Sequence, residues 1–230
     1  MPSPSLYGAE AFSHLADAVL VRWGVATREA ALAEEWPGGF TPIYEVLKAA
    51  EERGGVRRGW FIAGLGAAQF ARAGTEDLLR STRGEVAGSE TRWLSALDPA
   101  LPWGALAPWP TTAGKPARTV GAKVLLFEGV PAMWMGKGGN PCALFLPSDP
   151  ALHPEFLARV ADTLAEPVRS GAVRVVTLTK VDGVAAEASP LAGALAAAGF
   201  RPTSRGLVLS AADVRHLAKD VGRRGGHAGR

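Results

Sequence analysis

Residues 22–71 read RWGVATREAALAEEWPGGFTPIYEVLKAAEERGGVRRGWFIAGLGAAQFA, and this stretch decides the fold of the first part of the chain. Thr27 is placed to cap a helix over 28–35, because its hydroxyl can accept a hydrogen bond from the first free N–H groups of a helix. Thr41 and Pro42 predict the start of the next helix, in the favoured order of a cap followed by proline. The stretch therefore predicts two consecutive helices.

A hairpin completes the stretch. Apolar residues flank a glycine-rich centre, which is the pattern of two strands joined by a turn. A strand, a turn, a return strand and a short closing helix are predicted at 56–62, 63–66, 67–72 and 75–83. An apolar stripe at helical spacing over 12–23 predicts a further helix before Gly24. Helices followed by a hairpin predict a winged-helix domain over residues 1–84, a module that presents a helix and a ribbon to nucleic acid.

The composition changes after this block. Residues 93–116 are rich in Pro, Gly and Trp, and their prolines resist helix formation. Beyond them, short apolar runs alternate with helical periodicity, which predicts strands at 123–127, 132–135, 142–146, 173–181 and 207–209 and helices at 150–169 and 190–198. The expected fold class is α+β: a winged helix, then a partly open β-barrel or α+β domain over 85–209, and a basic tail over 210–230.

The net charge of +3 is unevenly distributed. Residues 201–230 carry seven Lys or Arg and two Asp or Glu, so the remaining residues sum to about −2 and the basic balance does not by itself indicate a binding face. The single cysteine, Cys142, excludes an internal disulfide and suits a reducing cytoplasm. Since no apolar run reaches the length that crosses a bilayer and no signal-peptide pattern opens the chain, we expect a cytoplasmic protein without a membrane partner.

Motifs for cofactors fail on spacing. The segment 129–137 resembles a phosphate loop, but six residues separate Gly129 from Gly136 where that loop has four, and Gly138 replaces the hydroxyl that would bind magnesium. We interpret it as a glycine hairpin. The four histidines are scattered, so no metal site is expected. Cys142 lies in an apolar strand and is expected to be a core thiol.

Candidate nucleic-acid contacts lie in and beside the hairpin. The third helix carries Glu45, Glu51 and Glu52, and these carboxylates would repel phosphates. The candidate cationic residues are Lys48, Arg53, Arg57 and Arg58. The hairpin arginines are expected to lead the contact, and the alternative is that they keep a solvated edge strand from aggregating.

Tryptophans supply the second kind of candidate, because nucleobases stack on exposed aromatic rings. Trp103 and Trp109 lie in a Pro/Gly loop and are expected to be better platforms than Trp23, Trp36 and Trp60, which we assign to the core.

Several segments together resemble the last winged helix and following domain of large helicase-related (Lhr) proteins. The hairpin RRGWFIAGLGAAQFA at 57–71 is the most specific of the matching segments. The segment LSALDPALPWG at 94–104 resembles the family's ATDPANPYG segment with several changes. Further matching segments lie at 22–29, 37–40, 44–47, 121–126, 189–191 and 198–203. The resemblance covers about residues 8–209.

The resemblance implies a region of a bacterial DNA-repair helicase that translocates on single-stranded DNA by hydrolysing ATP. The C-terminal part of that family is an array of winged helices ending in a β-barrel, it is similar to AlkZ-class DNA glycosylases, and some members form oligomers through it. ATP and Mg²⁺ are expected only on motor domains, whose motifs are absent from this sequence. The chain then corresponds either to a shortened gene product or to a protein whose motor is encoded elsewhere.

The function expected from these observations is that of a DNA-binding accessory module, whose partners are single-stranded or partly duplex DNA and helicase motor domains in cis or in trans. One alternative is an assembly module, including a homo-oligomer. Another is a stand-alone base-excision protein resembling a uracil glycosylase. Asp98 is the carboxylate to test for such chemistry, although an aspartate before proline in a loop usually forms a turn.

Overall fold

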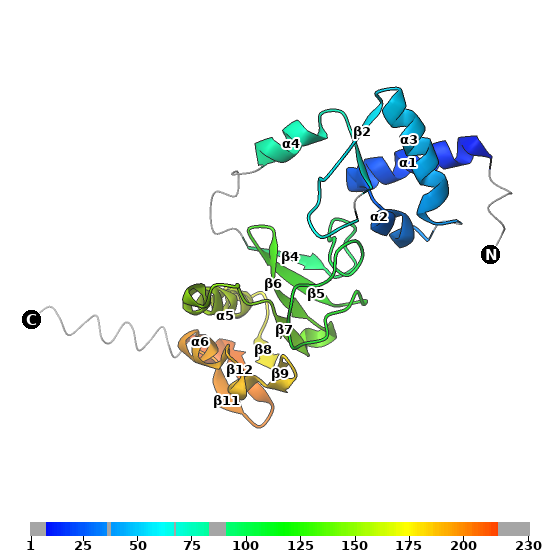
Figure 1. Cartoon of the computed structure of the whole chain (residues 1–230). Coiled ribbons are helices and arrows are strands. Elements are labelled where there is room, and N and C mark those ends of the chain that lie inside the picture. Colours follow the sequence, from blue (N-terminus) through cyan, green and yellow to red (C-terminus); the bar gives the residue numbers. More distant parts are fainter. Residues whose placement is uncertain (1–7, 36–37, 67, 83–90, 216–230) are drawn as a thin grey trace, which may run out of the picture. The chain divides into compact units, whose positions relative to one another are not determined.

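The computed structural model describes residues 8–35, 38–66, 68–82 and 91–215, and it divides into two compact units (Figure 1). The first unit comprises Met1–Ala87 together with Pro102–Trp109, and the second comprises Gly88–Leu101 and Pro110–Arg230. The boundary expected between residues 84 and 85 lies outside the described residues, as do residues 216–230 of the expected basic tail. The segment Pro102–Trp109, assigned from the sequence to the second domain, groups with the first unit.

The first unit has the element order of a winged helix. Its elements are α1 (Ala9–Trp23), β1 (Val25–Ala26), α2 (Arg28–Ala33), α3 (Phe40–Glu52), β2 (Val56–Gly59), β3 (Gln69–Arg72) and α4 (Thr75–Thr82). The strands form an antiparallel sheet in the order β1-β3-β2. The hairpin of β2 and β3, with the loop 60–68 between them, is called the wing below.

The structure confirms one predicted helix start in the first unit and corrects another. Thr27 caps α2 as predicted, since its Oγ1 accepts a hydrogen bond of 3.0 Å from the backbone N–H of Ala30. The predicted start of α3 at Thr41 and Pro42 was wrong. The N-cap is Gly39, whose φ of 61° lies in the left-handed region, and α3 begins at Phe40. Pro42 falls in the first turn, where its missing N–H removes no intrahelical bond.

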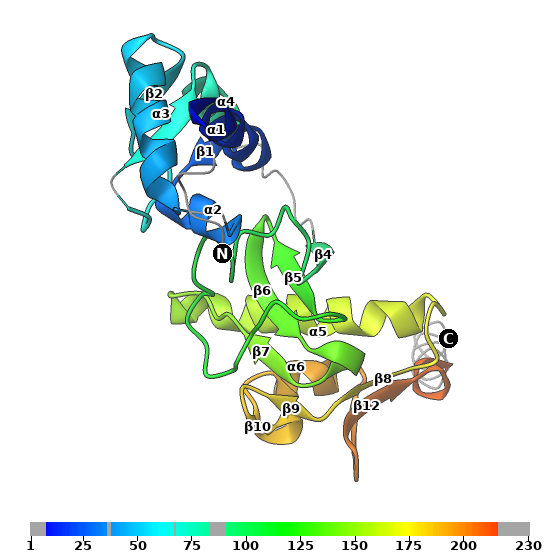
Figure 2. The same cartoon turned by 90° about the vertical axis from the view of Figure 1, so that its right-hand side faces the viewer.

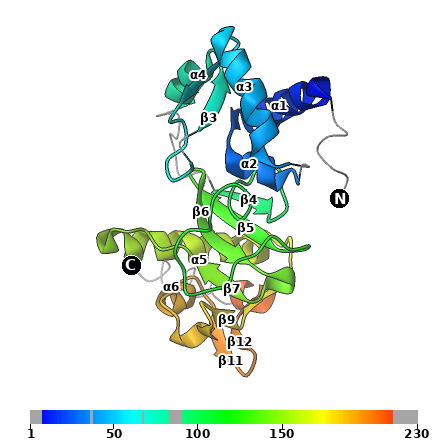
Figure 3. The ribbon, with the colours of Figure 1, turned by 45° about the vertical axis from the view of Figure 1, so that its right-hand side comes forward.

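The core of the first unit lies between α1, α3 and the sheet, and Figure 3 shows α1 beside α3. Ile43 and Leu47 on α3 and Phe70 on β3 are fully buried. Leu106, from the segment that returns to this unit, belongs to the same cluster. The apolar side chains of α3 therefore pack against Phe70 of β3, and this contact holds the base of the hairpin in place.

The second unit contains two sheets and two main helices. Its strands are β4 (Thr91–Ser95), β5 (Lys123–Phe127), β6 (Val130–Met135), β7 (Cys142–Leu144), β8 (Val175–Leu178), β9 (Lys180–Val181), β10 (Val184–Ala185), β11 (Arg201–Thr203) and β12 (Gly206–Ser210). Its helices are α5 (His153–Arg169) and α6 (Ala192–Ala197), with short 3₁₀ turns η2 (Lys137–Gly139), η3 (Pro150–Leu152) and η4 (Ala186–Ala188). The α+β class is confirmed.

The two sheets of this unit stay separate. One has the order β10-β9-β7-β6-β5-β4 and the other β11-β12-β8. Helix α5 packs along the larger sheet (Figure 2), and its Val160, Ala161 and Leu164 join Leu125 and Met133 in one buried cluster. The domain is therefore partly open, as expected, and its sheets do not close into a barrel.

In the second unit the predicted strand 173–181 was wrong, because these residues do not form a single element. The run breaks between β8 and β9, which belong to different sheets. Asn140 stabilises the break: its Oδ1 accepts from the backbone N–H of Thr179 at 2.7 Å, and its Nδ2 donates to the carbonyl of Thr177 at 3.1 Å. A side chain from a distant hairpin thus supplies the hydrogen bonds that a continuous ladder would otherwise make.

Candidate nucleic-acid interface

Arg57 and Arg58, called the wing arginines below, lie on opposite faces of an edge strand. Strand β2 pairs only with β3 in its sheet, with Arg57 opposite Ala71 and Arg58 opposite Phe70. Successive side chains of a strand point to opposite faces. Arg57 and Arg58 are adjacent in the sequence, but in the structure Arg57 faces α4 and Arg58 faces α3.

Arg58 lies against the third helix. Its Nε is 3.5 Å from a carboxylate oxygen of Glu51, and its Nη1 is 3.5 Å from the hydroxyl of Tyr44. The Tyr44 ring in turn makes an edge contact with Phe70, at 5.7 Å between centroids. Because 48% of the Arg58 side chain remains exposed, the guanidinium is positioned and still accessible.

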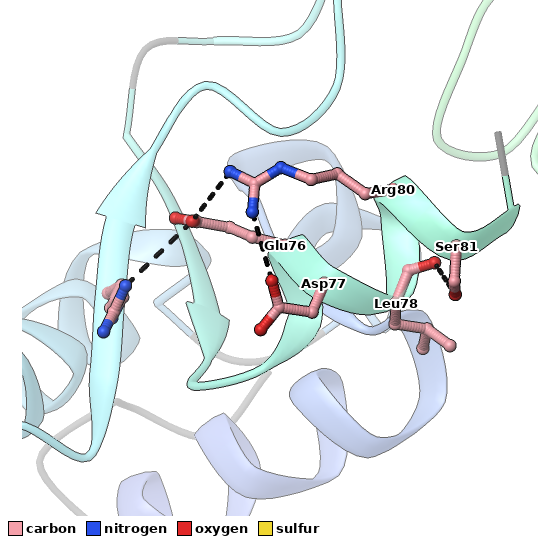
Figure 4. A network of polar contacts seen from close by, with 6 residues as sticks. Glu76, Asp77, Leu78, Arg80 and Ser81 are labelled. Atoms are coloured by element: carbon pink, nitrogen blue, oxygen red, sulfur yellow. Dashed lines mark hydrogen bonds and ion pairs between the residues drawn. The ribbon is translucent and has the colours of Figure 1, made fainter.

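Arg57 joins a network on α4. Its Nη1 is 4.0 Å from Glu76, and Glu76 is also 3.7 Å from the Nη2 of Arg80. Arg80 in addition donates to Asp77 at 3.1 Å, as Figure 4 shows. The Arg57 and Arg80 side chains are 66% and 70% exposed, so two guanidinium groups converge on one carboxylate at the surface.

The two other cationic candidates lie on α3 and at its end. Lys48 is exposed on α3, on the helical stripe that also carries Glu45 and Glu52. Arg53 is the C-cap residue of α3 and lines a hollow of about 260 Å³ together with Asp17 of α1. Lys48 lies one helical turn from Tyr44 and from Glu51, the two α3 residues that Arg58 contacts, whereas Arg53 lines the hollow toward α1.

Trp60 corrects a prediction. We assigned it to the core, but 75% of the residue is exposed. It borders two hollows: one of about 410 Å³ shared with Arg58 and Ala68, and one of about 350 Å³ shared with Glu76 and Arg80. Alternation along the strand did not signal this exposure, because β2 ends at Gly59 and Trp60 belongs to the loop.

Of the two other tryptophans assigned to the core, Trp23 is partly buried and its indole N–H donates to Glu34 at 3.0 Å. Trp36 lies outside the described residues.

Gln69 is the wing residue whose role the sequence analysis missed. It is fully buried, and its Oε1 accepts from the backbone N–H groups of Phe61 and Ile62 at 2.9 and 2.8 Å. Its Nε2 donates to the carbonyls of Ile62 and Gly66 at 2.9 and 3.0 Å. One amide therefore replaces the ladder of the predicted strand 56–62, which explains why β2 stops early and a shaped loop follows. A polar residue inside an apolar strand was the available signal.

Trp103 and Trp109 are partly buried parts of a compact loop. The backbone N–H of Gly104 donates to the carbonyl of Ala107 at 2.7 Å, and Trp103 and Ala107 form a β-bridge. A Cβ on Gly104 would lie only 2.5 Å from the indole nitrogen of Trp109. The glycine thus allows the ring to pack on the backbone, which is a structural use of the aromatic surface.

Asp98 lies in the second unit and acts within its own turn. Its Oδ1 accepts from the backbone N–H of Ala100 at 2.9 Å, and its carbonyl accepts from Leu101 at 3.0 Å and from Arg118 at 3.2 Å. A side-chain oxygen bonded two residues along the chain is an Asx turn. The carboxylate therefore has a turn-forming role in the structure.

The remaining motifs are structural. The phosphate-loop-like segment 129–137 is mostly strand β6, with Gly129 in the turn before the strand and Gly136 and Lys137 at the start of the connection to β7. Cys142 is buried at 2% exposure, which confirms a core thiol, and burial together with the negative charge of Asp182 raises its pKa to about 12.

Across the described ranges, no cluster of three or more His, Cys, Asp or Glu is arranged to hold a metal. None of the helices in those ranges has the length and apolar character needed to cross a bilayer.

Comparison with known proteins shows which proteins this chain is similar to. The winged-helix domain model of the large helicase-related protein matches residues 8–91. The chain is 36% identical over 207 residues to the "Lhr helicase/ probable uracil glycosylase" of Mycolicibacterium smegmatis, and 34% identical over 200 residues to the "Lhr helicase/uracil glycosylase" of Escherichia coli. Each match covers 84% of this chain and 13% of the relative. The chain therefore belongs to the large helicase-related family and corresponds to a C-terminal region of its members.

Proposed function

We propose that this chain is a DNA-binding accessory module of a large helicase-related DNA-repair helicase, and that its wing makes the principal contact with DNA. The family assignment supports a role beside a helicase motor, in cis or in trans. The chain spans 13% of the length of these relatives. We infer that the motor activity of such a helicase is supplied by other segments.

The observation that carries the proposal is the edge strand β2 with one arginine on each face. A ribbon that presents a guanidinium on both sides can contact phosphates on both sides of it, and such contacts supply affinity without reading sequence. Arg57 and Arg58 have this arrangement, with side chains 66% and 48% exposed. Helix α3 is a poorer phosphate neighbour, since Lys48 shares its exposed stripe with Glu45 and Glu52.

The carboxylates beside the wing arginines are compatible with this role. Glu76 and Glu51 are partly exposed, at 43% and 30%, and their distances to the arginines are 4.0 and 3.5 Å. Exposed ion pairs contribute only about 0–1 kcal/mol to stability. A phosphate can therefore replace either carboxylate at small cost, and the carboxylates keep the guanidinium groups oriented until DNA arrives.

A salt series with the full chain tests the proposal. We expect replacement of Arg57 or Arg58 by Ala to reduce the slope of log affinity against log salt by about 0.7 to 0.9, and the double replacement by about 1.5 to 2. Labelled single-stranded and duplex DNA would be titrated at several salt concentrations. Arg22→Ala is the matched control, because Arg22 is an ion-paired arginine of α1 with 60% exposure. An unchanged slope in the double variant contradicts a wing-led contact.

A second candidate is a protein-assembly module, and the paired state of both wing arginines favours it. Glu51 and Glu76 offset the positive charge of Arg58 and Arg57, so the wing surface is close to neutral overall. This candidate predicts self-association or capture of helicase motor domains in sedimentation experiments, without DNA binding at low salt. DNA binding by the parent chain that follows the expected salt slope excludes it as the main role.

A further inference from the structure

The exposed indole of Trp60 is attached to a fixed backbone. The next two residues, Phe61 and Ile62, donate their backbone N–H groups to the buried Oε1 of Gln69. Phe61 is only partly exposed, whereas 75% of Trp60 is exposed. A large aromatic side chain held in water without cover is unfavourable unless it meets a partner, because apolar surface gains free energy on burial.

Each of the two hollows that the indole borders has charged as well as apolar lining residues. The hollow of about 410 Å³ beside Trp60 is lined by Arg58, Gly59 and Ala68. The hollow of about 350 Å³ is lined by Gly59, Phe61, Glu76, Leu79 and Arg80. Trp60 lines both hollows, and each of them also has one guanidinium group in its lining, that of Arg58 or that of Arg80. An apolar protein partner would be expected to meet a continuous apolar patch, whereas Arg58, Glu76 and Arg80 interrupt the apolar surface around Trp60.

We propose that Trp60 is a stacking platform for an unpaired nucleobase, with Arg58 and Arg80 within reach of the phosphates on either side of the stacked nucleotide. The inference rests on the proposed DNA-binding function and specifies its substrate as single-stranded DNA. Bases in a duplex are already stacked on their neighbours, whereas an unpaired base can place its face on an exposed ring. Every base has such a face, so the site is expected to tolerate any sequence.

Three ligands with the same number of phosphates separate stacking from charge: an oligothymidine strand, an abasic strand of equal length, and a duplex. We expect the parent chain to bind oligothymidine more tightly than the abasic strand. Trp60→Ala should weaken binding to oligothymidine by roughly 5- to 150-fold, which is the range found for loss of one stacked base, and leave the abasic strand and the salt slope unchanged. Trp60→Phe should retain part of the preference. Val21→Ala is the control for an exposed apolar residue, since Val21 is 71% exposed on α1.

Each other outcome has a distinct meaning. If Trp60→Ala weakens binding to all three ligands equally, Trp60 acts on the shape of the wing and the stacking proposal is overturned. If it changes none of them while Arg57→Ala and Arg58→Ala still lower the salt slope, the wing binds DNA without stacking, so the proposed function stands alone. If the parent chain binds none of the ligands at low salt, the proposed function fails and stacking fails with it. Amide spectra of the Trp60 variants would verify that the first unit remains folded.

Discussion

A single buried amide shapes the wing. Gln69 is fully buried in a strand whose other inward residues are apolar. Its side-chain amide donates to and accepts from backbone groups of the loop 60–68. Burying an amide is costly unless it is hydrogen-bonded, and here the bonds also satisfy backbone groups that the shortened strand β2 leaves open. The position of Trp60 at the surface is therefore determined by a residue nine positions later in the chain.

Cys142 gives a pH dependence whose sign follows from its pKa. The folded value of about 12 lies above the ordinary value of 9.0, so folding favours the protonated thiol. Its contribution to stability is complete below pH 9 and is lost as pH rises toward 12, by up to about 1.4 kcal/mol per pH unit. We expect Cys142→Ala to flatten this decline in urea unfolding of the second unit between pH 9 and 11. A decline equally steep in the variant would assign it to other groups.

At the scale of elements, helix α4 supplies the carboxylate that pairs with Arg57 of the wing. Glu76 lies near the guanidinium groups of both Arg57 on β2 and Arg80 on its own helix (Figure 4). The edge strand and the helix are thus coupled through one carboxylate. On the proposed function, a DNA phosphate would compete with that carboxylate for the same donors, so we expect α4 to lower the affinity of the strand for DNA.

Glu76→Gln tests this coupling. Removing the carboxylate charge should raise the affinity for DNA by roughly 2- to 5-fold at low salt, the free-energy range of an exposed ion pair, because Arg57 and Arg80 are released. The measurement is the same DNA titration. Glu10→Gln on α1 is the matched control, since it changes the net charge equally at an exposed site away from the wing. Equal affinities of the two variants would show that Glu76 does not restrain the wing.

At the scale of the whole molecule, the two units are interleaved in sequence. The chain leaves the first unit, contributes Gly88–Leu101 to the second, and supplies Pro102–Trp109 to the first before it completes the second. Leu106 in the returning segment is 9% exposed and belongs to the core of the winged helix. The stability of the first unit therefore depends on residues beyond the winged-helix match at 8–91.

Leu106→Ala should destabilise the first unit by about 2–3 kcal/mol, since it removes buried apolar volume from that core. Leu97→Ala, at 42% exposure, should change stability by less than about 0.5 kcal/mol and is the matched control. Urea unfolding followed through the amide signals of Ile43 and Leu47 reports on the correct unit. If those signals unfold at the same urea concentration in the Leu106 variant and the parent, Leu106 is not part of that core.

Much of the local structure could be predicted from the sequence. The cap at Thr27, the hairpin base, the strand at 123–127 and the buried Cys142 all follow from a few neighbouring residues and their periodicity. The start of α3 was not predicted, because its N-cap is Gly39 and not the hydroxyl residue Thr41. Gly39 makes no side-chain cap hydrogen bond and has a positive φ, which the sequence pattern did not indicate.

The sequence by itself determined the class of the fold, the order of the winged helix and the family, because these depend on patterns along the chain. Only the tertiary structure decided that Trp60 is exposed, that Arg57 and Arg58 pair with different helices, and that Leu106 completes the first core. These features arise from contacts between residues far apart in the chain. Periodicity records which face of an element is apolar, but not which distant side chain will cover it.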